Sequence, residues 1–401
     1  MSKILNALTQ NFDSPKRDSL WGHIYLTGAL EKITKTEAFM KLHRIMQLGP
    51  VYLCYPGATH TRASHSLGVY HLTRRILLHL VSRGADSYLT KEGVFSMLCA
   101  SLLHDLGHFP YTHSLKELPL LEHEKLSARL VLSEPLKSLI YTAGADAEMT
   151  AAIISPQEGG EESGELRFYR RLLSGVMDPD KLDYLNRDAL YCGVPYGVQD
   201  VDFVISMLHP DREKGIVIEE RGIPSVEAIL FSKYLMYRSV YWHRRVRGAT
   251  AMVKKALFEG LKDGVLCGEE LYGLDDGGLF NLLKERRHSA FYLAQMVKEG
   301  RLFSCVKEDP FNEELHKDLL NLKTRAQKEE IIAKEASEKT GRKIPSSRVV
   351  IDVPEEVVFE TDLFAKNEMN DFWNSSSFFK KDVVNAFVKT LRIVRVYIED
   401  Q

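Results

Sequence analysis

Histidine side chains are concentrated in one part of this 401-residue chain, because eight of its 14 histidines lie between residues 60 and 123. Within that part, His104 and Asp105 stand side by side at the end of an apolar run. A buried carboxylate is costly unless it is paired or bound to a cation, and imidazole is a common ligand of divalent metals. Because an isolated His-Asp pair is more often a helix-end hydrogen bond or a surface ion pair, the pair alone only suggests metal binding.

Two further segments could supply the remaining ligands. His65 lies on a preceding amphipathic stretch, where Arg62, one helical turn earlier, shares its face. The segment 176–184 carries several carboxylates and a lysine at the start of a predicted helix. A second carboxylate from that segment would complete a set of two histidines and two aspartates. Such a set suits Mn²⁺, Fe²⁺, Ni²⁺, Zn²⁺ or Mg²⁺ and leaves positions open for water or substrate.

The elements that must position these residues are mostly helices. Apolar side chains recur with helical spacing over 34–49 and 62–83, which predicts two amphipathic helices. The stretch 91–106 is apolar on nearly every face, which is typical of a buried central helix. Residues 225–261 are expected to form another long helix, with tyrosines, a tryptophan and basic residues along it.

Strand signals are sparse and mostly late in the chain. A short hairpin or edge strand is expected at 215–219, and β-branched, partly alternating strands at 349–353, 357–360 and 392–398. A helical stretch at 382–390 lies between the last two, so the C-terminal third is predicted to be an α+β module. Residues 157–165 are predicted to be a loop, and 323–342 a solvated, charged helix.

Composition and charge exclude several classes of protein. The 44% hydrophobic and 27% charged residues are typical of a folded globular chain, and the net charge of −2 argues against a surface devoted to nucleic acid. Apolar runs are far shorter than the roughly 20 residues that cross a bilayer, and the chain begins without a continuous apolar signal region. The five cysteines are widely spaced without a C-x-x-C pair, which predicts a reduced, cytoplasmic protein with no thiolate zinc site.

The order of His65, His104-Asp105 and Asp180 resembles the HD-domain metal-dependent phosphohydrolases. Within that family, over half of the chain is similar to the deoxynucleoside-triphosphate triphosphohydrolase (dGTPase-like) branch. Six ordered motifs carry the resemblance: FMKLHRIMQLG (39–49), YPGATHTRASHSLGV (55–69), LLHDLGHFPYTHSL (102–115), LEHEKLS (121–127), DPDKLDYLNRDALYCGVPYG (178–197) and YLMYRSVYWHRRVR (234–247).

The resemblance implies a reaction and a role for each matching residue. One divalent metal ion would be held by His65, His104, Asp105 and Asp180. Water would attack the α-phosphorus of a deoxynucleoside triphosphate and release inorganic triphosphate and a deoxynucleoside. The catalytic residues expected on the phosphate side are His108, His113, His123 and Glu124, with His113 as general acid and Glu124 orienting a histidine.

A second set of residues is expected to bind the nucleotide. Basic side chains would face the triphosphate, because a guanidinium or ammonium group donates hydrogen bonds to phosphate oxygens. An apolar side chain and a tyrosine packed against the sugar would exclude a 2′-hydroxyl, as the resemblance implies. The expected substrate-binding residues are Gln47, Leu48, Arg62, Lys181, Tyr184, Asp188, Lys233 and Tyr241, with Arg238 as a further basic candidate.

The sequence departs from the family pattern at several positions. Lys116 stands where an acid usually supports the general-acid histidine, and Glu117 follows it. Trp242 occupies a base-side position that is polar in the mammalian branch, so base preference is not carried over. Lys35 and His43 replace the aspartate and arginine that read a guanine activator there, so we expect no activation by GTP through that route.

We expect a mainly α fold, with an HD helical core over 1–260 and a smaller C-terminal α+β module over 261–401 that serves oligomerisation. The expected partners are a nucleotide substrate and further copies of the chain, with no membrane. Three alternatives stay open: an HD phosphohydrolase of another nucleotide (a monophosphate, alarmone or cyclic nucleotide), an inactive nucleotide-binding regulator, and a nucleic-acid-binding helical protein suggested by the alternating aromatic and arginine residues of 237–247.

Overall fold

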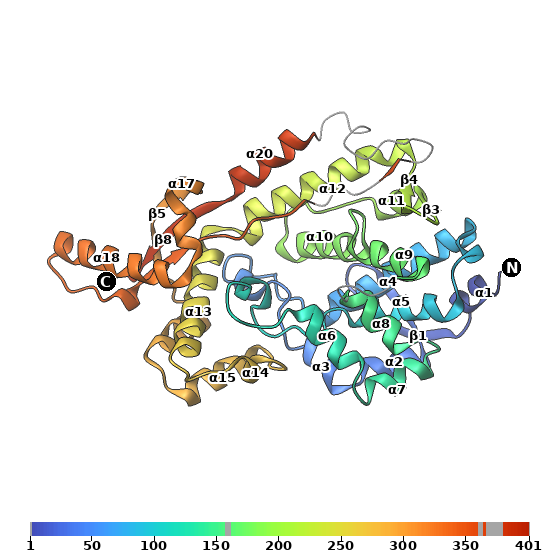
Figure 1. Ribbon diagram of the computed structural model, residues 1–401, viewed down its shortest axis with the longest axis horizontal. Helices are drawn as coiled ribbons and strands as arrows, with labels where there is room; N and C mark the ends of the chain where they lie inside the picture. The colour runs from blue at the N-terminus through green and yellow to red at the C-terminus, as the bar shows by residue number, and fades with distance from the viewer. Residues whose placement is uncertain (1, 157–161, 360–363, 366–379, 401) are drawn as a thin grey trace.

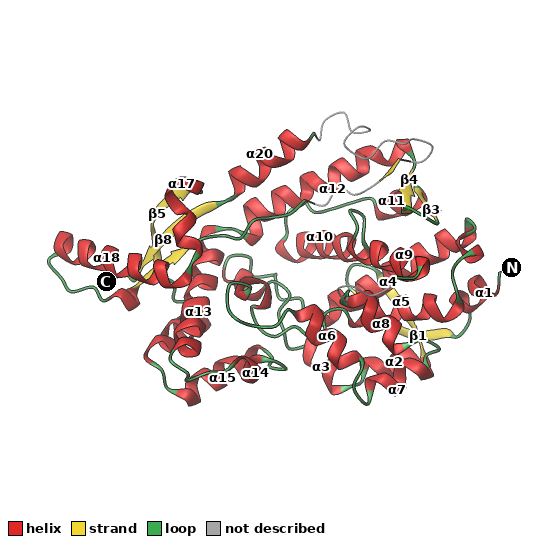
Figure 2. Cartoon of the chain, viewed as in Figure 1, coloured by secondary structure: helices red, strands yellow, loops and turns green. Residues whose placement is uncertain are grey.

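The computed structural model describes residues 2–156, 162–359, 364–365 and 380–400. Helices dominate the described chain, and its strands form three small sheets (Figure 2). The expectation of a mainly α protein with a mixed C-terminal part is therefore confirmed. No helix among the described residues is both long and apolar enough to cross a lipid bilayer.

An N-terminal hairpin precedes the helical core and was not expected from the sequence. Strands β1 (Phe12–Asp18) and β2 (Gly22–Thr27) pair antiparallel between helices α1 (Lys3–Thr9) and α2 (Gly28–Thr34). The hairpin turn is closed by Asp18, whose carboxylate accepts hydrogen bonds from the backbone N–H groups of Leu20 and Trp21 at 2.9 and 2.8 Å. Of the seven residues of β1 only Asp18 is buried, so its sequence shows little apolar alternation.

Three helices form the centre of the core, where α4 (Arg62–Ser82) packs against α5 (Lys91–Leu103) and α10 (Pro179–Cys192). Every residue of α5 from Gly93 onward is buried, which confirms the predicted central helix. The helix ends at Leu103, so His104 and Asp105 follow it directly. Around this core lie α6 (His123–Val131), α7 (Leu136–Thr142), α8 (Ala147–Ile154), α9 (Gly164–Ser174) and α11 (Val201–Ser206). Residues 157–161 of the predicted loop lie outside the described residues.

The helix predicted over 34–49 is wrong in its second half. Helix α3 covers only Glu37–Leu42, and a short 3₁₀ helix follows at Gly49–Leu53. Between them the backbone turns and pairs with the residues that precede α4. The N–H of Gln47 donates to the carbonyl of His60 at 3.0 Å, and the N–H of Arg62 donates to Ile45 at 3.1 Å. These bonds use the groups that a continuous helix would need, and they bring Gln47 beside the start of α4.

The long helix predicted over 225–261 is two helices. Helix α12 (Ile223–Met236) continues into a π-helical turn at Tyr237–Tyr241, and α13 (Arg244–Lys262) starts after a break at Trp242. Wide turns of this kind are often found at functional sites. The predicted strand at 215–219 is confirmed as β4 (Gly215–Ile218), which pairs with β3 (Leu208–Asp211) in a hairpin.

The C-terminal part combines helices with a three-stranded antiparallel sheet. Strands β5 (Ser304–Pro310), β8 (Ile393–Ile398) and β6 (Val349–Asp352) lie in the order β5-β8-β6. In Figure 1 this sheet lies at the far side of α13 from the core, and α20 (Lys381–Leu391) lies along α12. The remaining elements are α14 (Gly268–Leu271), α15 (Asp276–Arg286), α16 (Tyr292–Lys298), α17 (Glu313–His316), α18 (Leu322–Thr340) and β7 (Phe364–Ala365), which pairs with β4.

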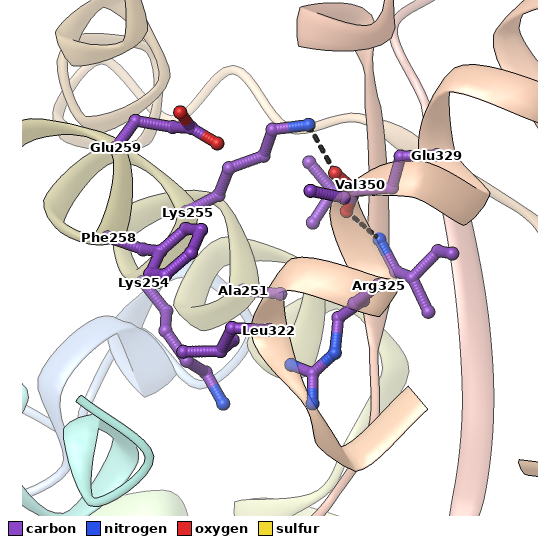
Figure 3. Close-up of a pocket in the computed structure, with 11 residues that line it drawn as sticks. Ala251, Lys254, Lys255, Phe258, Glu259, Leu322, Arg325, Glu329 and Val350 are labelled. Atoms are coloured by element: carbon purple, nitrogen blue, oxygen red, sulfur yellow. Dashed lines mark hydrogen bonds and ion pairs between the residues drawn. The ribbon is translucent and has the colours of Figure 1, made fainter. Parts of the chain in front are cut away.

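Two expectations for this part need correction. Residues 357–359 belong to no strand, and Glu360 lies outside the described residues. Helix α18 is mostly solvated, yet Arg325, Glu329 and Ala333 are buried. Figure 3 shows this face of α18 against α13, where Lys255 donates to Glu329 at 2.6 Å. The boundary expected at residue 260 falls within the last turn of α13, and the division into two domains stays a prediction.

Candidate active site

Four side chains from three remote segments converge at the centre of the core. His65 comes from the first turn of α4, His104 and Asp105 follow α5, and Asp180 lies in the first turn of α10. Oδ1 of Asp180 lies 2.9 Å from Nε2 of His65 and 3.7 Å from Nε2 of His104. Oδ1 of Asp105 lies 3.4 Å from Nε2 of His104. The structure therefore brings together all four residues of the predicted metal set.

The hydrogen bonds of the two histidines orient the same ring nitrogen toward this point. Nδ1 of His65 donates to Asp183 at 2.8 Å, and Nδ1 of His104 donates to the carbonyl of Ser101 at 2.9 Å. The other nitrogen, Nε2, is thereby available as a ligand atom on both rings. Within the described part of the chain, Nε2 of His104 is buried without a hydrogen-bond partner. A divalent cation fits this donor set, because it would satisfy that atom and both carboxylates.

Electrostatics keep the two carboxylates ionised. Burial by itself would raise the pKa of Asp105, but His108, His104 and Arg62 hold it well below its usual range. Burial also opposes ionisation of Asp180, and the neighbouring imidazoles of His104 and His65 keep its pKa well below the usual value. Burial lowers the pKa of His65, yet Asp180 and Asp183 outweigh that effect and raise it to about 10. A cation that binds Nε2 of His65 must therefore displace a proton.

The predicted catalytic histidines form a second cluster next to the first. The ring of His108 stacks on that of His123 with centroids 3.8 Å apart, and His113 lies 4.7 Å from His108 and 5.0 Å from His123. His108 and His123 are buried, whereas His113 is exposed to the cavity. Nε2 of His108 lies 3.0 Å from Oδ1 of Asp105, which links the two clusters.

The buried members of this cluster are neutral near pH 7. Burial and then the charge of Arg62 lower the pKa of His108 well below its usual range, and burial and then His113 do the same for His123. Oε2 of Glu124 lies 3.1 Å from Nδ1 of His123, in the position expected for a group that orients this ring. Neutral imidazoles can donate an N–H to a phosphate oxygen, so the cluster suits an anionic ligand.

A single cavity of about 730 Å³ joins these groups. Its volume lies in the range typical of small-molecule sites. Every site residue expected from the sequence lines it except His108, which is covered by His123. Arg238 does not line the cavity, and its guanidinium donates to the hydroxyl of Tyr234 at 3.0 Å.

The basic residues of the cavity wall are held by partners in the protein. Nη1 of Arg62 donates to Asp105 at 2.8 Å. Nζ of Lys181 donates to Asp178 at 2.6 Å, and Nζ of Lys233 donates to the carbonyl of Val358 at 2.7 Å. A phosphate bound here would therefore contact basic side chains that are already positioned by these hydrogen bonds.

Another part of the cavity wall carries tyrosine rings, a glutamine and an aspartate. The carboxylate of Asp188 lies 2.8 Å from Nε2 of His60 and accepts from the hydroxyl of Tyr241 at 2.6 Å. The ring centroids of Tyr184 and Tyr241 lie 6.5 Å apart, with the ring planes at 68° to each other. Oε1 of Gln47 is buried, and no group in the described ranges donates a hydrogen bond to it. This orphaned acceptor could take a hydrogen bond from a ligand hydroxyl.

Several residues around the site were missed by sequence reasoning. Asp183, which accepts a hydrogen bond from His65, lies within the 178–197 motif. It is the third aspartate of this segment and lies one helical turn after Asp180, and this spacing could have identified it. Glu355 and Glu356 come from the C-terminal part and line the cavity, although no local pattern marks them.

Lys116 and Glu117 stand where the family pattern has an acid that supports the general-acid histidine, and neither of them supports His113. Lys116 lines the cavity, and Glu117 turns away to pair with Lys254 and, at 2.7 Å, with Arg325 (Figure 3 shows these two partners). Glu117 therefore ties the loop that carries His113 to the C-terminal part of the chain.

Comparisons with known proteins agree with this geometry. Residues 62–183 match the HD domain, and residues 200–381 match the HD associated region. Residues 62–183 thus form an HD domain, and the resemblance to this family is confirmed.

Its relatives include proteins of known and unknown activity. An uncharacterized protein of Bacillus subtilis, YwfO, is 36% identical over 225 residues, which are 55% of this chain and 50% of that protein. The deoxynucleoside triphosphate triphosphohydrolase SAMHD1 of Gallus gallus is 28% identical over 273 residues, which are 60% of this chain and 44% of that protein. The chain spans about half the length of these curated relatives. The crystal structure of a phosphohydrolase from Bacteroides thetaiotaomicron has the same fold, with a TM-score of 0.75, 23% identity and coverage of 96% of this chain and 99% of that one.

Proposed function

We propose that this protein is a divalent-metal-dependent hydrolase that converts deoxynucleoside triphosphates to deoxynucleosides and inorganic triphosphate. The observation that carries the proposal is the convergence of His65, His104, Asp105 and Asp180 beside the three-histidine cluster in one cavity. The relationship to the deoxynucleoside triphosphate triphosphohydrolase of Gallus gallus supports the choice of substrate.

The four converging residues would hold the cation. When bound, a divalent cation supplies polarisation of a phosphate oxygen and lowers the pKa of water. Water adds to the α-phosphorus and releases a proton to the solvent, the bond from this phosphorus to the 5′-oxygen breaks, and the 5′-oxygen leaves with a proton. We assign that proton to His113, because it is the member of the cluster that is exposed to the cavity. Burial and then His108 lower the pKa of His113 well below its usual range, so His113 would gain its proton when the anionic phosphates bind. His123, protonated beside the anionic phosphate, would donate one N–H to Glu124 and the other to a phosphate oxygen. His108, which was expected to contact the phosphate, lies behind His123 and would support that ring instead.

The remaining wall residues would bind and select the nucleotide. Arg62, Lys181 and Lys233 carry positive charge toward the phosphates. Gln47 offers a buried acceptor for the 3′-hydroxyl, and Leu48 and Tyr184 would pack against the deoxyribose where a 2′-hydroxyl would stand. Asp188 and Tyr241 close the sugar and base side through their 2.6 Å hydrogen bond.

The direct test incubates the purified protein with each of the four deoxynucleoside triphosphates in the presence of Mn²⁺ or Mg²⁺ and analyses the products. We expect inorganic triphosphate, and none from Asp180→Asn. Orthophosphate or pyrophosphate would indicate another nucleotide reaction of HD proteins. Tight binding without turnover would indicate a regulatory nucleotide-binding protein, and absence of any product with every metal would contradict the proposed substrate.

Assembly and location belong to the same proposal. We infer a homo-oligomer in the cytoplasm, with the C-terminal part in the subunit contacts. Light scattering of the purified chain gives its mass in solution directly, and a monomer at all concentrations would contradict this assembly.

A further inference from the structure

Asp183 accepts a hydrogen bond from the imidazole of His65. Among the described residues, it makes no hydrogen bond to the other predicted metal ligands. Oδ2 of Asp183 accepts from Nδ1 of His65 at 2.8 Å and from Nε of Arg187 at 2.8 Å. Oδ1 accepts from Nη2 of Arg187 at 2.9 Å and from Nε1 of Trp21 at 2.5 Å. All four partners of this buried carboxylate are hydrogen-bond donors, so its orientation is fully determined.

Two of these partners come from outside the family matches. Trp21 lies in the turn of the N-terminal hairpin, well before residue 62, where the HD match begins. Arg187 lies between the two matched regions and also donates to Asp18, which closes the same turn, at 2.8 Å. Arg187 is completely buried and Asp18 nearly so. The hairpin turn is therefore connected to His65 through two buried hydrogen-bonded paths.

The packing of α4 leaves no freedom for this arrangement to shift. Gly68 lies one turn after His65, and a Cβ atom there would stand 1.8 Å from Oδ1 of Asp183 and 2.5 Å from Nη2 of Arg187. Glycine is thus required at the point where the carboxylate and guanidinium approach the helix backbone. The ion pair of Asp183 and Arg187 therefore packs directly against the backbone of α4 at Gly68.

We propose that Asp183 is a positioning residue of the metal centre and that the hairpin turn Asp18–Trp21 belongs to that centre through it. The inference rests on the proposed metal ligands but not on the identity of the substrate. By accepting the Nδ1 proton, Asp183 selects the tautomer of His65 that presents Nε2 to a cation. Arg187 and Trp21 in turn prevent the carboxylate from rotating away from the imidazole.

The test measures the dissociation constant of Mn²⁺ by titration calorimetry on the full chain after removal of metal. In Asp183→Asn, the amide NH₂ must face two hydrogen-bond donors whichever way the side chain is turned. The four hydrogen bonds that Asp183 accepts therefore cannot all form in this variant. We expect Mn²⁺ to bind about 10- to 100-fold more weakly, the usual cost of losing such a partner. Trp21→Phe removes one donor and keeps the apolar ring, and we expect a smaller loss, about threefold to tenfold.

Tyr70→Phe is the matched control. Tyr70 is buried on α4 and its hydroxyl donates to Tyr25 of the hairpin at 3.0 Å, so the variant removes a hairpin contact that does not reach Asp183. We expect a lower melting temperature with an unchanged Mn²⁺ dissociation constant. If Asp183→Asn does not fold, Trp21→Phe decides the matter.

The outcomes separate this inference from the proposed function. Folded Trp21→Phe and Asp183→Asn proteins that bind Mn²⁺ within twofold of the parent would overturn it, as would weakening of equal size in Tyr70→Phe. A parent that binds no Mn²⁺ would overturn the metal centre and this inference together. A parent that binds Mn²⁺ but hydrolyses no deoxynucleoside triphosphate would contradict only the proposed function.

Discussion

Oδ1 of Asp180 lies 2.9 Å from Nε2 of His65, so two predicted metal ligands are paired with each other. A protonated imidazole at the buried His65 neutralises the partly exposed Asp180 carboxylate. A cation therefore competes with a proton for Nε2 of His65.

The first prediction follows from this competition. Burial lowers the pKa of His65, but Asp180 and Asp183 raise it to about 10, so the ring is protonated below that pH and must lose its proton to bind a metal. Mn²⁺ affinity should therefore rise by about tenfold per pH unit as the pH increases from 6 to 9. Calorimetric titrations in buffers of different ionisation enthalpy measure both the affinity and the protons released. An affinity independent of pH would show that His65 is already neutral.

The second prediction concerns stabilisation by the metal. A ligand that binds only the folded state at 100 times its dissociation constant stabilises it by about 2.7 kcal/mol. We expect Mn²⁺ to raise the melting temperature of the parent and to leave that of Asp180→Asn unchanged. Asp202→Asn is the control, because Asp202 pairs with Arg75 at the surface and should preserve the Mn²⁺ effect. An equal rise in Asp180→Asn would place the cation elsewhere.

The third prediction tests the connection between the C-terminal part and the catalytic loop. Arg325 donates to Glu117 at 2.7 Å, and Glu117 follows the short helix Thr112–Leu115 that carries His113. We expect Arg325→Ala to lower kcat by about tenfold with little change in KM, because a misplaced general acid affects the chemical step.

The control for this variant is Arg348→Ala, which breaks the surface pair with Glu399 in the same part of the chain. It should retain the parent kcat. If Arg325→Ala loses activity only in proportion to its unfolded fraction, the contact is structural and does not position the loop.

The fourth prediction addresses selection of the sugar. Leu48 lines the cavity beside Gln47, and we propose that it occupies the space of a 2′-hydroxyl. Leu48→Ala should raise kcat/KM for ribonucleoside triphosphates relative to the deoxy forms by about tenfold, since one or two methylene groups discriminate by roughly that factor. Leu190→Ala on α10, at a half-exposed position outside the cavity, should leave the ratio unchanged. An unaltered ratio in Leu48→Ala would remove Leu48 from the sugar site.

The sequence by itself determined the helical core and the chemistry of its centre. Helices α4 and α5 follow from apolar spacing, because a helix must bury a continuous face whatever its partners are. His65, His104, Asp105 and Asp180 could be chosen because carboxylates next to apolar runs need a counter-charge, and because their order matches a family pattern.

Only the tertiary structure decided how the site is supported. The turn that presents Gln47 depends on pairing with the residues before α4, and the partners of Lys233 and Glu117 come from the C-terminal part. Asp183 is held by a hairpin turn from the start of the chain. These contacts join segments far apart in sequence, and local periodicity records which face of an element is buried but not which side chain it meets there.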